Sequence, residues 1–186
     1  MENNTNLFWI WPNALSNDEI DRIHEKAQKE KTIKGSVFDG NKEARKSNIK
    51  WINDLSAHEA IWALGNRVNA EGFGYDLYER INDIQYTEYS YSNKGTYDWH
   101  IDMPIGTPIS YRMRKLSIII QLTDSSEYEG GDILFKISGK EETHPESFRQ
   151  KGTLIAFPSF IMHKVTPVTK GTRNSLVTWF EGPNWR

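Results

Sequence analysis

From about residue 82 onward, the chain is a series of short apolar runs separated by turn-forming residues. Turn signals such as Ser92-Asn93-Lys94-Gly95 and Glu129-Gly130-Gly131 stand between the runs, which lie at 84–91, 97–102, 116–122, 132–137, 153–157, 160–165 and 173–180. Short runs at this spacing, with no helical pattern between them, are typical of the strands of a β-sandwich or barrel. The sequence therefore predicts a jelly-roll core, a double-stranded β-helix, over about 82–182.

Two helices are expected before these strands. Ser16 and Glu19 have the spacing of a capping box, in which both side chains bond to backbone N–H groups at a helix start. Apolar residues follow at helical spacing, so we expect a helix over about 17–30. The pattern recurs at Ser56 and Glu59 and predicts a second helix that ends before Gly72.

The segment Gly35–Asn48, between the helices, is polar and contains glycine, and it is expected to form a loop or loose hairpin. A short strand is expected at 49–52. We expect one domain over 1–186, with helical support over about 1–80 packed on the outer face of one sheet. The predicted fold class is α+β, mainly β.

Composition excludes several classes of protein. With no cysteine among 186 residues, the chain cannot form disulfides, zinc–thiolate sites or iron–sulfur clusters, so any metal must be held by histidine and carboxylates. No apolar run approaches the roughly 18 residues of a membrane-spanning helix. The opening MENNTNLFWIWPN lacks the basic and apolar regions of a signal peptide, so a cytoplasmic location is expected.

The charge pattern does not favour nucleic acid as a partner. The formal net charge is −2 and the isoelectric point is about 6.2, so no global positive field is present. The densest basic stretches, Lys42–Lys50 and Arg112–Lys115, are short. Both are interpreted as solvated loops.

One predicted strand carries a candidate metal-binding pair. In Tyr97-Asp98-Trp99-His100-Ile101-Asp102 polar and apolar residues alternate, so His100 and Asp102 should point to the same face. His163 is the best candidate for a third ligand. Two histidines and one carboxylate occupy one face of an octahedron and leave three positions open, as non-haem iron(II) oxygenases require.

Arg173 and Ser175 are expected to share one face of a later strand. A guanidinium group there suits a bidentate grip on a carboxylate, in which each charge-assisted bond is worth roughly 1.5–3 kcal/mol. A surface salt bridge near the end of the strand is the alternative interpretation of this arginine.

These residues belong to longer motifs, in the order Tyr91-x-x-x-Gly95-Thr96-Tyr97-Asp98-Trp99-His100-x-Asp102, Glu127-Tyr128-Glu129-Gly130-Gly131-Asp132, and Phe157-Pro158-Ser159 leading to His163-x-Val165-x-Pro167-Val168-Thr169-x-Gly171-x-Arg173. Over about 84–182 they resemble the 2-oxoglutarate/iron(II) dioxygenases of the prolyl 4-hydroxylase-like group. This resemblance implies that His100, Asp102 and His163 bind Fe(II) and that Arg173 binds the distal carboxylate of 2-oxoglutarate.

The resemblance further implies that Tyr91, and more weakly Ser175, hydrogen-bonds to the co-substrate. O2 would be consumed, succinate and CO2 released, and ascorbate would serve as reductant. Asp102 favours hydroxylation, because halogenating relatives lack this carboxylate. Nucleic-acid demethylases of the superfamily carry a second arginine where this chain has Trp179.

The leading functional hypothesis is hydroxylation of a prolyl residue in a protein or peptide. Another amino-acid residue or a free small molecule is the alternative substrate, and a jelly-roll binding module with a structural metal is the alternative from a different class. Trp99, Trp179 and Gln121 are weaker candidates for the pocket wall. The segments 35–48 and 103–114 are expected near the mouth of the site, as possible substrate lids.

Overall fold

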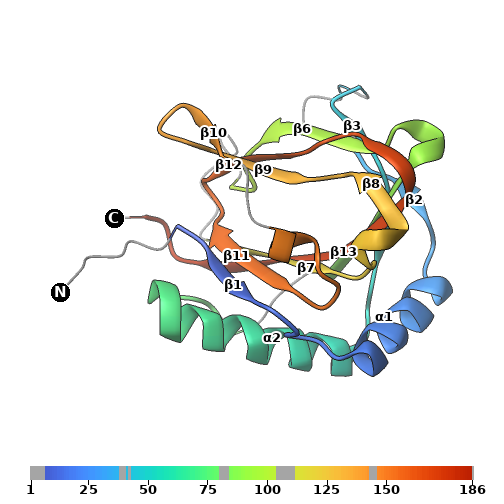
Figure 1. Cartoon of the computed structure of the whole chain (residues 1–186). Coiled ribbons are helices and arrows are strands. Elements are labelled where there is room, and N and C mark those ends of the chain that lie inside the picture. Colours follow the sequence, from blue (N-terminus) through green and yellow to red (C-terminus); the bar gives the residue numbers. More distant parts are fainter. Residues whose placement is uncertain are drawn as a thin grey trace.

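In the computed structural model, which describes residues 7–37, 41, 43–79, 84–103, 112–142 and 146–185, two antiparallel sheets face each other (Figure 1). The larger sheet contains β1 (Trp9–Trp11), β2 (Ile33–Lys34), β4 (Asn48–Trp51), β5 (Ile84–Ser90), β7 (Met113–Gln121), β8 (Tyr128–Gly130), β11 (Leu154–Pro158) and β13 (Val168–Gly182). The smaller sheet contains β3 (Arg45–Lys46), β6 (Thr96–His100), β9 (Ile133–Ile137), β10 (Lys140–Glu142) and β12 (Met162–Val165).

The strand order is that of a jelly roll. The larger sheet runs β1-β11-β7-β13-β5-β4-β2, with β8 also paired to β13, and the smaller sheet runs β10-β9-β12-β6-β3. Consecutive strands of the chain therefore alternate between the two sheets over much of the fold. The predicted mainly β architecture, with a double-stranded β-helix core and two helices on one sheet, is confirmed.

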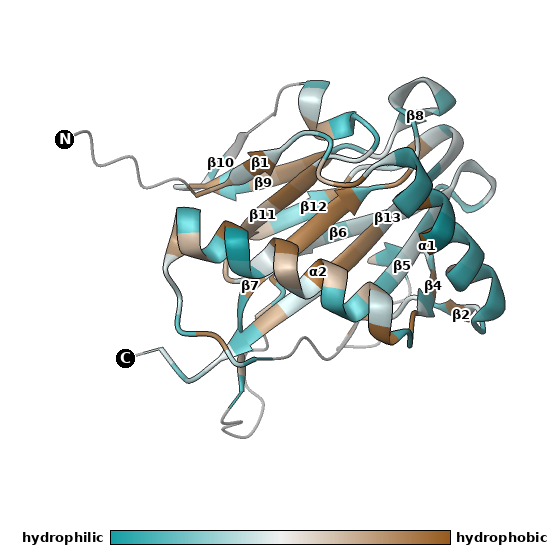
Figure 2. Cartoon of the chain, turned by 90° about the horizontal axis from the view of Figure 1, so that it is seen from below, coloured by the Kyte–Doolittle hydropathy of each residue, from teal (hydrophilic) through white to brown (hydrophobic). Residues whose placement is uncertain are grey.

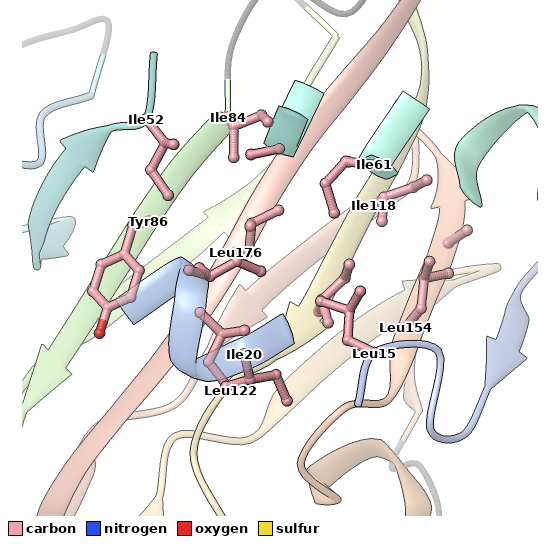
Figure 3. Packing of buried hydrophobic residues seen from close by; sticks show 14 of the residues in the cluster. Leu15, Ile20, Ile52, Ile61, Ile84, Tyr86, Ile118, Leu122, Leu154 and Leu176 are labelled. Carbon is pink, nitrogen blue, oxygen red and sulfur yellow. The ribbon is translucent and has the colours of Figure 1, made fainter. Parts of the chain in front are cut away.

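The helices α1 (Asn17–Lys29) and α2 (Leu55–Val68) cover the outer face of the larger sheet (Figures 1 and 2). Figure 2 shows apolar strands beneath them and mostly polar residues on the helix surfaces that face away from the sheet. The core between these layers joins residues of both helices to the central strands, among them Ile20, Ile61, Ile118, Leu154 and Leu176 (Figure 3). Among the described residues, no helix is both long and apolar enough to span a membrane.

The capping box predicted for α1 is confirmed. The Ser16 side chain accepts a hydrogen bond from the Glu19 backbone, and the Ser16 N–H donates to Glu19 Oε2 at 2.8 Å. The prediction of a second capping box at Ser56 and Glu59 was wrong, because the N-cap of α2 is Asp54, whose side chain accepts a hydrogen bond from the Ala57 N–H at 3.0 Å. The helical path also passes Gly72, since a π-helical turn continues over Asn69–Phe73.

Side chains of the central strand β13 point alternately to its two faces, which have different surroundings. Leu176 and Phe180 point into the core beneath the helices. Arg173, Ser175 and Trp179 are buried on the other face, toward the smaller sheet. Because side chains of a strand alternate with period two, one strand serves both the core and the space between the sheets.

The contact between α2 and β13 has no room for another methyl group. A Cβ placed on Gly65 would lie 1.9 Å from the Phe180 ring. We expect Gly65→Ala to lower the free energy of unfolding by about 1–3 kcal/mol through overpacking, although alanine favours helix more than glycine does. Urea denaturation will measure this change.

Two further variants isolate the steric cause. Ala63→Ser adds one heavy atom at an exposed position of α2 and should change stability little. In a Phe180→Leu background, Gly65→Ala should cost less than in the original chain, because the smaller side chain leaves space. The same cost in both backgrounds would contradict the assigned contact.

Candidate active site

A cavity of about 460 Å³ lies between the two sheets. The smaller sheet contributes Tyr97, His100 and His163, and the larger sheet contributes residues of β4, β5, β7 and β13. The full lining is Ser36, Arg45, Ile49, Trp51, Gln85, Tyr89, Tyr97, His100, Ile101, Asp102, Met103, Arg114, Ile119, His163, Val165, Arg173, Ser175, Val177 and Trp179. Charged and metal-ligating groups therefore gather in a space enclosed by strands.

His100, Asp102 and His163 meet in this cavity, with ligand atoms within 4.8 Å of one another. His163 and His100 are direct cross-strand partners of β12 and β6, and their ring centroids are 4.1 Å apart. The Nε2 atoms of His100 and His163 lie 3.8 and 3.7 Å from the two oxygens of Asp102. The predicted triad is thus brought together, by strand pairing as well as by its sequence spacing.

Backbone carbonyl groups fix the orientation of the two imidazoles. Nδ1 of His100 and of His163 donates to the carbonyl oxygens of Asp98 and Ile161, at 2.8 and 3.0 Å. Since a carbonyl only accepts, each Nδ1 carries a proton, and Nε2 is the nitrogen that can face a metal ion. Asp102 lies beyond the end of β6, not on it as predicted, and its N–H donates to the Ser159 carbonyl at 3.0 Å.

The protonation states suit a cation. Burial, together with the neighbouring His163, lowers the pKa of His100 to about 3, so its imidazole is neutral at physiological pH. Burial acts to raise the pKa of Asp102, but the two imidazoles and the polar groups of Ser117 and Trp179 outweigh it, and the pKa lies below its ordinary value. Asp102 Oδ2 is buried without a hydrogen-bond partner among the described residues.

Two imidazoles and one carboxylate, with an unpaired oxygen among them, fit a divalent iron centre. Nitrogen and oxygen ligands on one face of the ion leave the other positions to small molecules. The buried Oδ2 of Asp102 would gain a partner from such an ion.

Arg173 is the largest fully buried side chain and is 1% exposed. None of its three nitrogen atoms has a hydrogen-bond partner among the described residues. Its guanidinium group lies 5.5 Å from the ring centre of Tyr89, and Ser175 lines the same cavity. A buried, unpaired charge costs several kcal/mol, so this position calls for an anionic partner that the described protein groups do not supply.

The prediction for Tyr91 was wrong in its geometry. Tyr91 lies in a turn after β5, is 58% exposed and does not line the cavity. Tyr89 takes its place, 4% exposed beside Arg173, because residues two apart in β5 share the inward face. The strand ends at Ser90, so Tyr91 no longer follows the alternation.

Of the three weaker candidates for the pocket wall, one lines the cavity and two do not. Trp179 lines the cavity. Trp99 points away from it, with the ammonium groups of Lys136 and Lys164 over its ring. The side-chain amide of Gln121 donates to the Phe148 carbonyl at 2.8 Å and lies outside the cavity lining.

Sequence reasoning missed Arg45 and Arg114. Both belong to stretches interpreted as solvated loops, yet they lie on β3 and β7 and line the cavity. The alternation around each residue was too short to show a strand. The proposed lid segments contribute Ser36, Arg45, Met103 and Arg114 to the lining, while 38–40, 42 and 104–111 fall outside the described residues.

Comparison with known proteins agrees with the site. A family model described as the 2OG-Fe(II) oxygenase superfamily matches residues 84–181. A PKHD-type hydroxylase of Alteromonas mediterranea is 31% identical over 79% of this chain and 62% of that protein. The PKHD-type hydroxylase YbiX of Escherichia coli O1:K1 is 28% identical over 91% of this chain and 76% of that protein. The chain thus spans less than two thirds of the first relative.

Solved structures share the fold. A prolyl-4-hydroxylase of Pseudomonas putida superposes with a TM-score of 0.72 at 18% identity, covering 96% of this chain and 94% of that one. A prolyl hydroxylase of Trichoplax adhaerens, solved with a peptide fragment of a hypoxia inducible factor, gives 0.71 at 21% identity, covering 95% and 84%.

Fold and site together define a jelly-roll protein with a two-histidine, one-carboxylate centre beside a buried arginine. The chain belongs to the 2-oxoglutarate/Fe(II) oxygenase superfamily, and it is similar to the prolyl-hydroxylase-like members of that superfamily. The family resemblance drawn from the sequence motifs is therefore confirmed.

The unpaired state of Arg173 has a measurable cost. We expect Arg173→Met to raise the free energy of unfolding of the ligand-free chain by about 1–4 kcal/mol, because it replaces a buried charge with an apolar chain of similar length. Denaturant unfolding without added metal or acid will measure it.

Arg149→Met is the matched control. Arg149 is partly buried, but it pairs with Asp132 and donates to the carbonyl oxygens of Gly130 and Tyr128, so its loss should destabilise the chain. Destabilisation of the Arg173 variant by a similar amount would mean that Arg173 already has a partner in the ligand-free protein.

Proposed function

We propose that the chain is an Fe(II)- and 2-oxoglutarate-dependent dioxygenase. It would hydroxylate an unactivated C–H bond and release succinate and CO2. The observation that carries this proposal is the buried, unpaired guanidinium group of Arg173 in the same cavity as His100, Asp102 and His163. A metal site alone is compatible with many functions. A metal site beside a buried guanidinium group is suited to a dicarboxylic acid that binds the metal ion at one end and the guanidinium group at the other.

In this proposal, the Nε2 atoms of His100 and His163 and the carboxylate of Asp102 hold the iron. The bonds from Nδ1 to backbone carbonyls keep both imidazoles in the required tautomer and orientation. When bound, the iron and 2-oxoglutarate together supply oxygen activation and cleavage of the C–H bond.

Arg173 would bind the distal carboxylate of 2-oxoglutarate through paired N–H donors. Ser175 lies on the same face of β13 and would add a hydroxyl group, and Tyr89 would close the site from β5. This assigns to Tyr89 the role that the sequence motif implied for Tyr91.

Apolar side chains complete the wall of the cavity. Ile49, Ile119, Val165 and Val177 contribute from four strands of both sheets. A largely dry wall strengthens the ionic contacts of Arg173 and protects a reactive centre from water.

A prolyl residue in a protein or peptide is the proposed substrate. The sequence motifs, the likeness in fold to solved prolyl hydroxylases and the peptide bound to the Trichoplax protein support it. Another amino-acid residue or a free small molecule is the alternative. A non-catalytic binding module is disfavoured, because such a module has no use for an anion clamp buried beside an open metal face.

Turnover without substrate tests the reaction type. Purified protein with Fe(II), ascorbate and 2-oxoglutarate should release succinate slowly, and His100→Ala or Asp102→Ala should abolish this release by removing a metal ligand. Arg173→Ala should raise the 2-oxoglutarate concentration for half-maximal turnover by about tenfold or more, because it removes a charge-assisted bidentate contact.

A metal-binding measurement distinguishes the role of the metal ligands from the role of Arg173 in binding 2-oxoglutarate. Binding of Mn(II) should be lost in the His100 and Asp102 variants and nearly intact in the Arg173 variant. An equal loss of metal affinity in all three variants would show that Arg173 is misassigned. Absence of succinate from the unmodified protein, when metal is bound, would refute the proposed reaction.

A further inference from the structure

Two more arginines line the cavity, and the reaction as proposed does not use them. Arg45 comes from β3 of the smaller sheet and Arg114 from β7 of the larger sheet, so the two reach the cavity from different sheets. We propose that the substrate carries a carboxylate close to the carbon that is hydroxylated, and that Arg45 and Arg114 bind this carboxylate. The inference rests on the proposed function, whose site it extends.

Arg45 is held beside the metal-binding histidines. Its guanidinium group stacks over the Tyr97 ring at 4.5 Å, and that ring in turn stacks on the imidazole of His100 at 3.5 Å. Its Nε donates to Ser47 Oγ at 2.9 Å, and its guanidinium group also interacts with the hydroxyl group of Tyr89, so only part of its N–H donors is used within the protein. No carboxylate of the described residues forms a salt bridge with it.

Arg114 is held in a similar way on the other sheet. It stacks over the Trp179 ring at 3.9 Å, and its Nη1 lies 3.4 Å from the carbonyl oxygen of Asp102. It also has no carboxylate partner among the described residues, whereas nearby Arg112 pairs with Glu181 at 3.0 Å. Arg112 lies just before β7 and Arg114 lies on it, and of the two only Arg114 lines the cavity.

Stacking on an aromatic ring orients a guanidinium group without consuming its charge. The N–H donors along the edge of the plane stay free for a planar carboxylate. Two arginines positioned in this way, one against each sheet, are arranged to bind an acidic group and not to neutralise an acid of the protein.

The charge balance of the cavity leads to the same substrate class. Among the described lining residues, the charged side chains are those of Arg45, Arg114, Arg173 and Asp102, and a histidine that binds a metal ion does so as the neutral imidazole. Fe(II) and 2-oxoglutarate bring opposite charges of equal size, so they leave this excess of positive charge unchanged. An anionic substrate group would offset the excess, and a cationic one would add to it.

The carboxylate has two possible sources, a side chain next to the target residue in a peptide or the α-carboxylate of a free amino acid. Two pairs of probes distinguish them. The first pair is the blocked peptide Gly-Glu-Pro-Glu-Gly and its glutamine analogue, and the second is free L-proline and L-prolinamide. Each pair differs in charge but hardly in shape.

Binding is measured without oxygen, so that it is independent of turnover. Protein supplied with Fe(II) and 2-oxoglutarate is titrated with each probe, and the tryptophan fluorescence of Trp51 and Trp179 in the cavity wall reports occupancy. We expect one carboxylate probe to bind about tenfold or more tightly than its neutral partner. This preference should shrink at high salt, because both arginines are only partly buried.

Variants assign the preference to the two arginines. Arg45→Gln and Arg114→Gln should each reduce it severalfold, and Arg114→Lys should keep part of it. Lys46→Gln and Arg112→Gln are matched controls, since both residues are paired with glutamates outside the cavity lining and their loss should leave the preference intact. Circular dichroism will check that each variant is folded.

The binding experiment can fail independently of the proposed reaction. A preference for the glutamate peptide assigns the carboxylate to a side chain, and a preference for proline over prolinamide assigns it to a free amino acid. Equal binding within both pairs would overturn the inference, as would an equal loss in the control variants. Failure of the proposed function would appear instead as absence of succinate release from the unmodified protein.

Discussion

The buried positive charge of Arg173 is the constraint on which the rest of the site depends. A guanidinium group that is 1% exposed, with no bonded partner among the described residues, costs the ligand-free protein stability that the surrounding sheet must supply. In the proposed function, a small dicarboxylic acid offsets this cost when it binds. The protein would then give up stability in exchange for selectivity toward one class of co-substrate.

In the jelly roll, the alternation of side chains along each strand allows a charged group such as Arg173 to lie inside the fold without disrupting the apolar core. The outward faces of β5, β7 and β13 carry the apolar core beneath the helices (Figure 3), and their inward faces carry the polar groups of the cavity beside apolar side chains such as Ile119 and Val177. The smaller sheet then needs only one cross-strand pair, His100 and His163, to complete a metal site. Arg45 and Arg114 extend the same design toward the substrate, each held by an aromatic ring near a metal-binding residue.

Much of this arrangement was predictable from local patterns. Strand positions and the helix start at Ser16 follow from short-range periodicity and capping chemistry, which the sequence displays directly. Tyr91 was misplaced because the motif does not show where the strand ends, and one residue beyond that end decides whether a side chain is buried. Arg45 and Arg114 were missed because a basic residue on a two-residue strand, or at a strand start, looks the same in sequence as one in a loop.

A crystal structure of the protein grown with Fe(II) and 2-oxoglutarate in the absence of oxygen would show directly whether Arg173 binds the co-substrate. We expect a metal ion bound by His100, Asp102 and His163, with the far carboxylate of the acid paired to both terminal nitrogens of Arg173. A structure in which the acid binds elsewhere, or in which Arg173 pairs with a carboxylate of the protein itself, would contradict it.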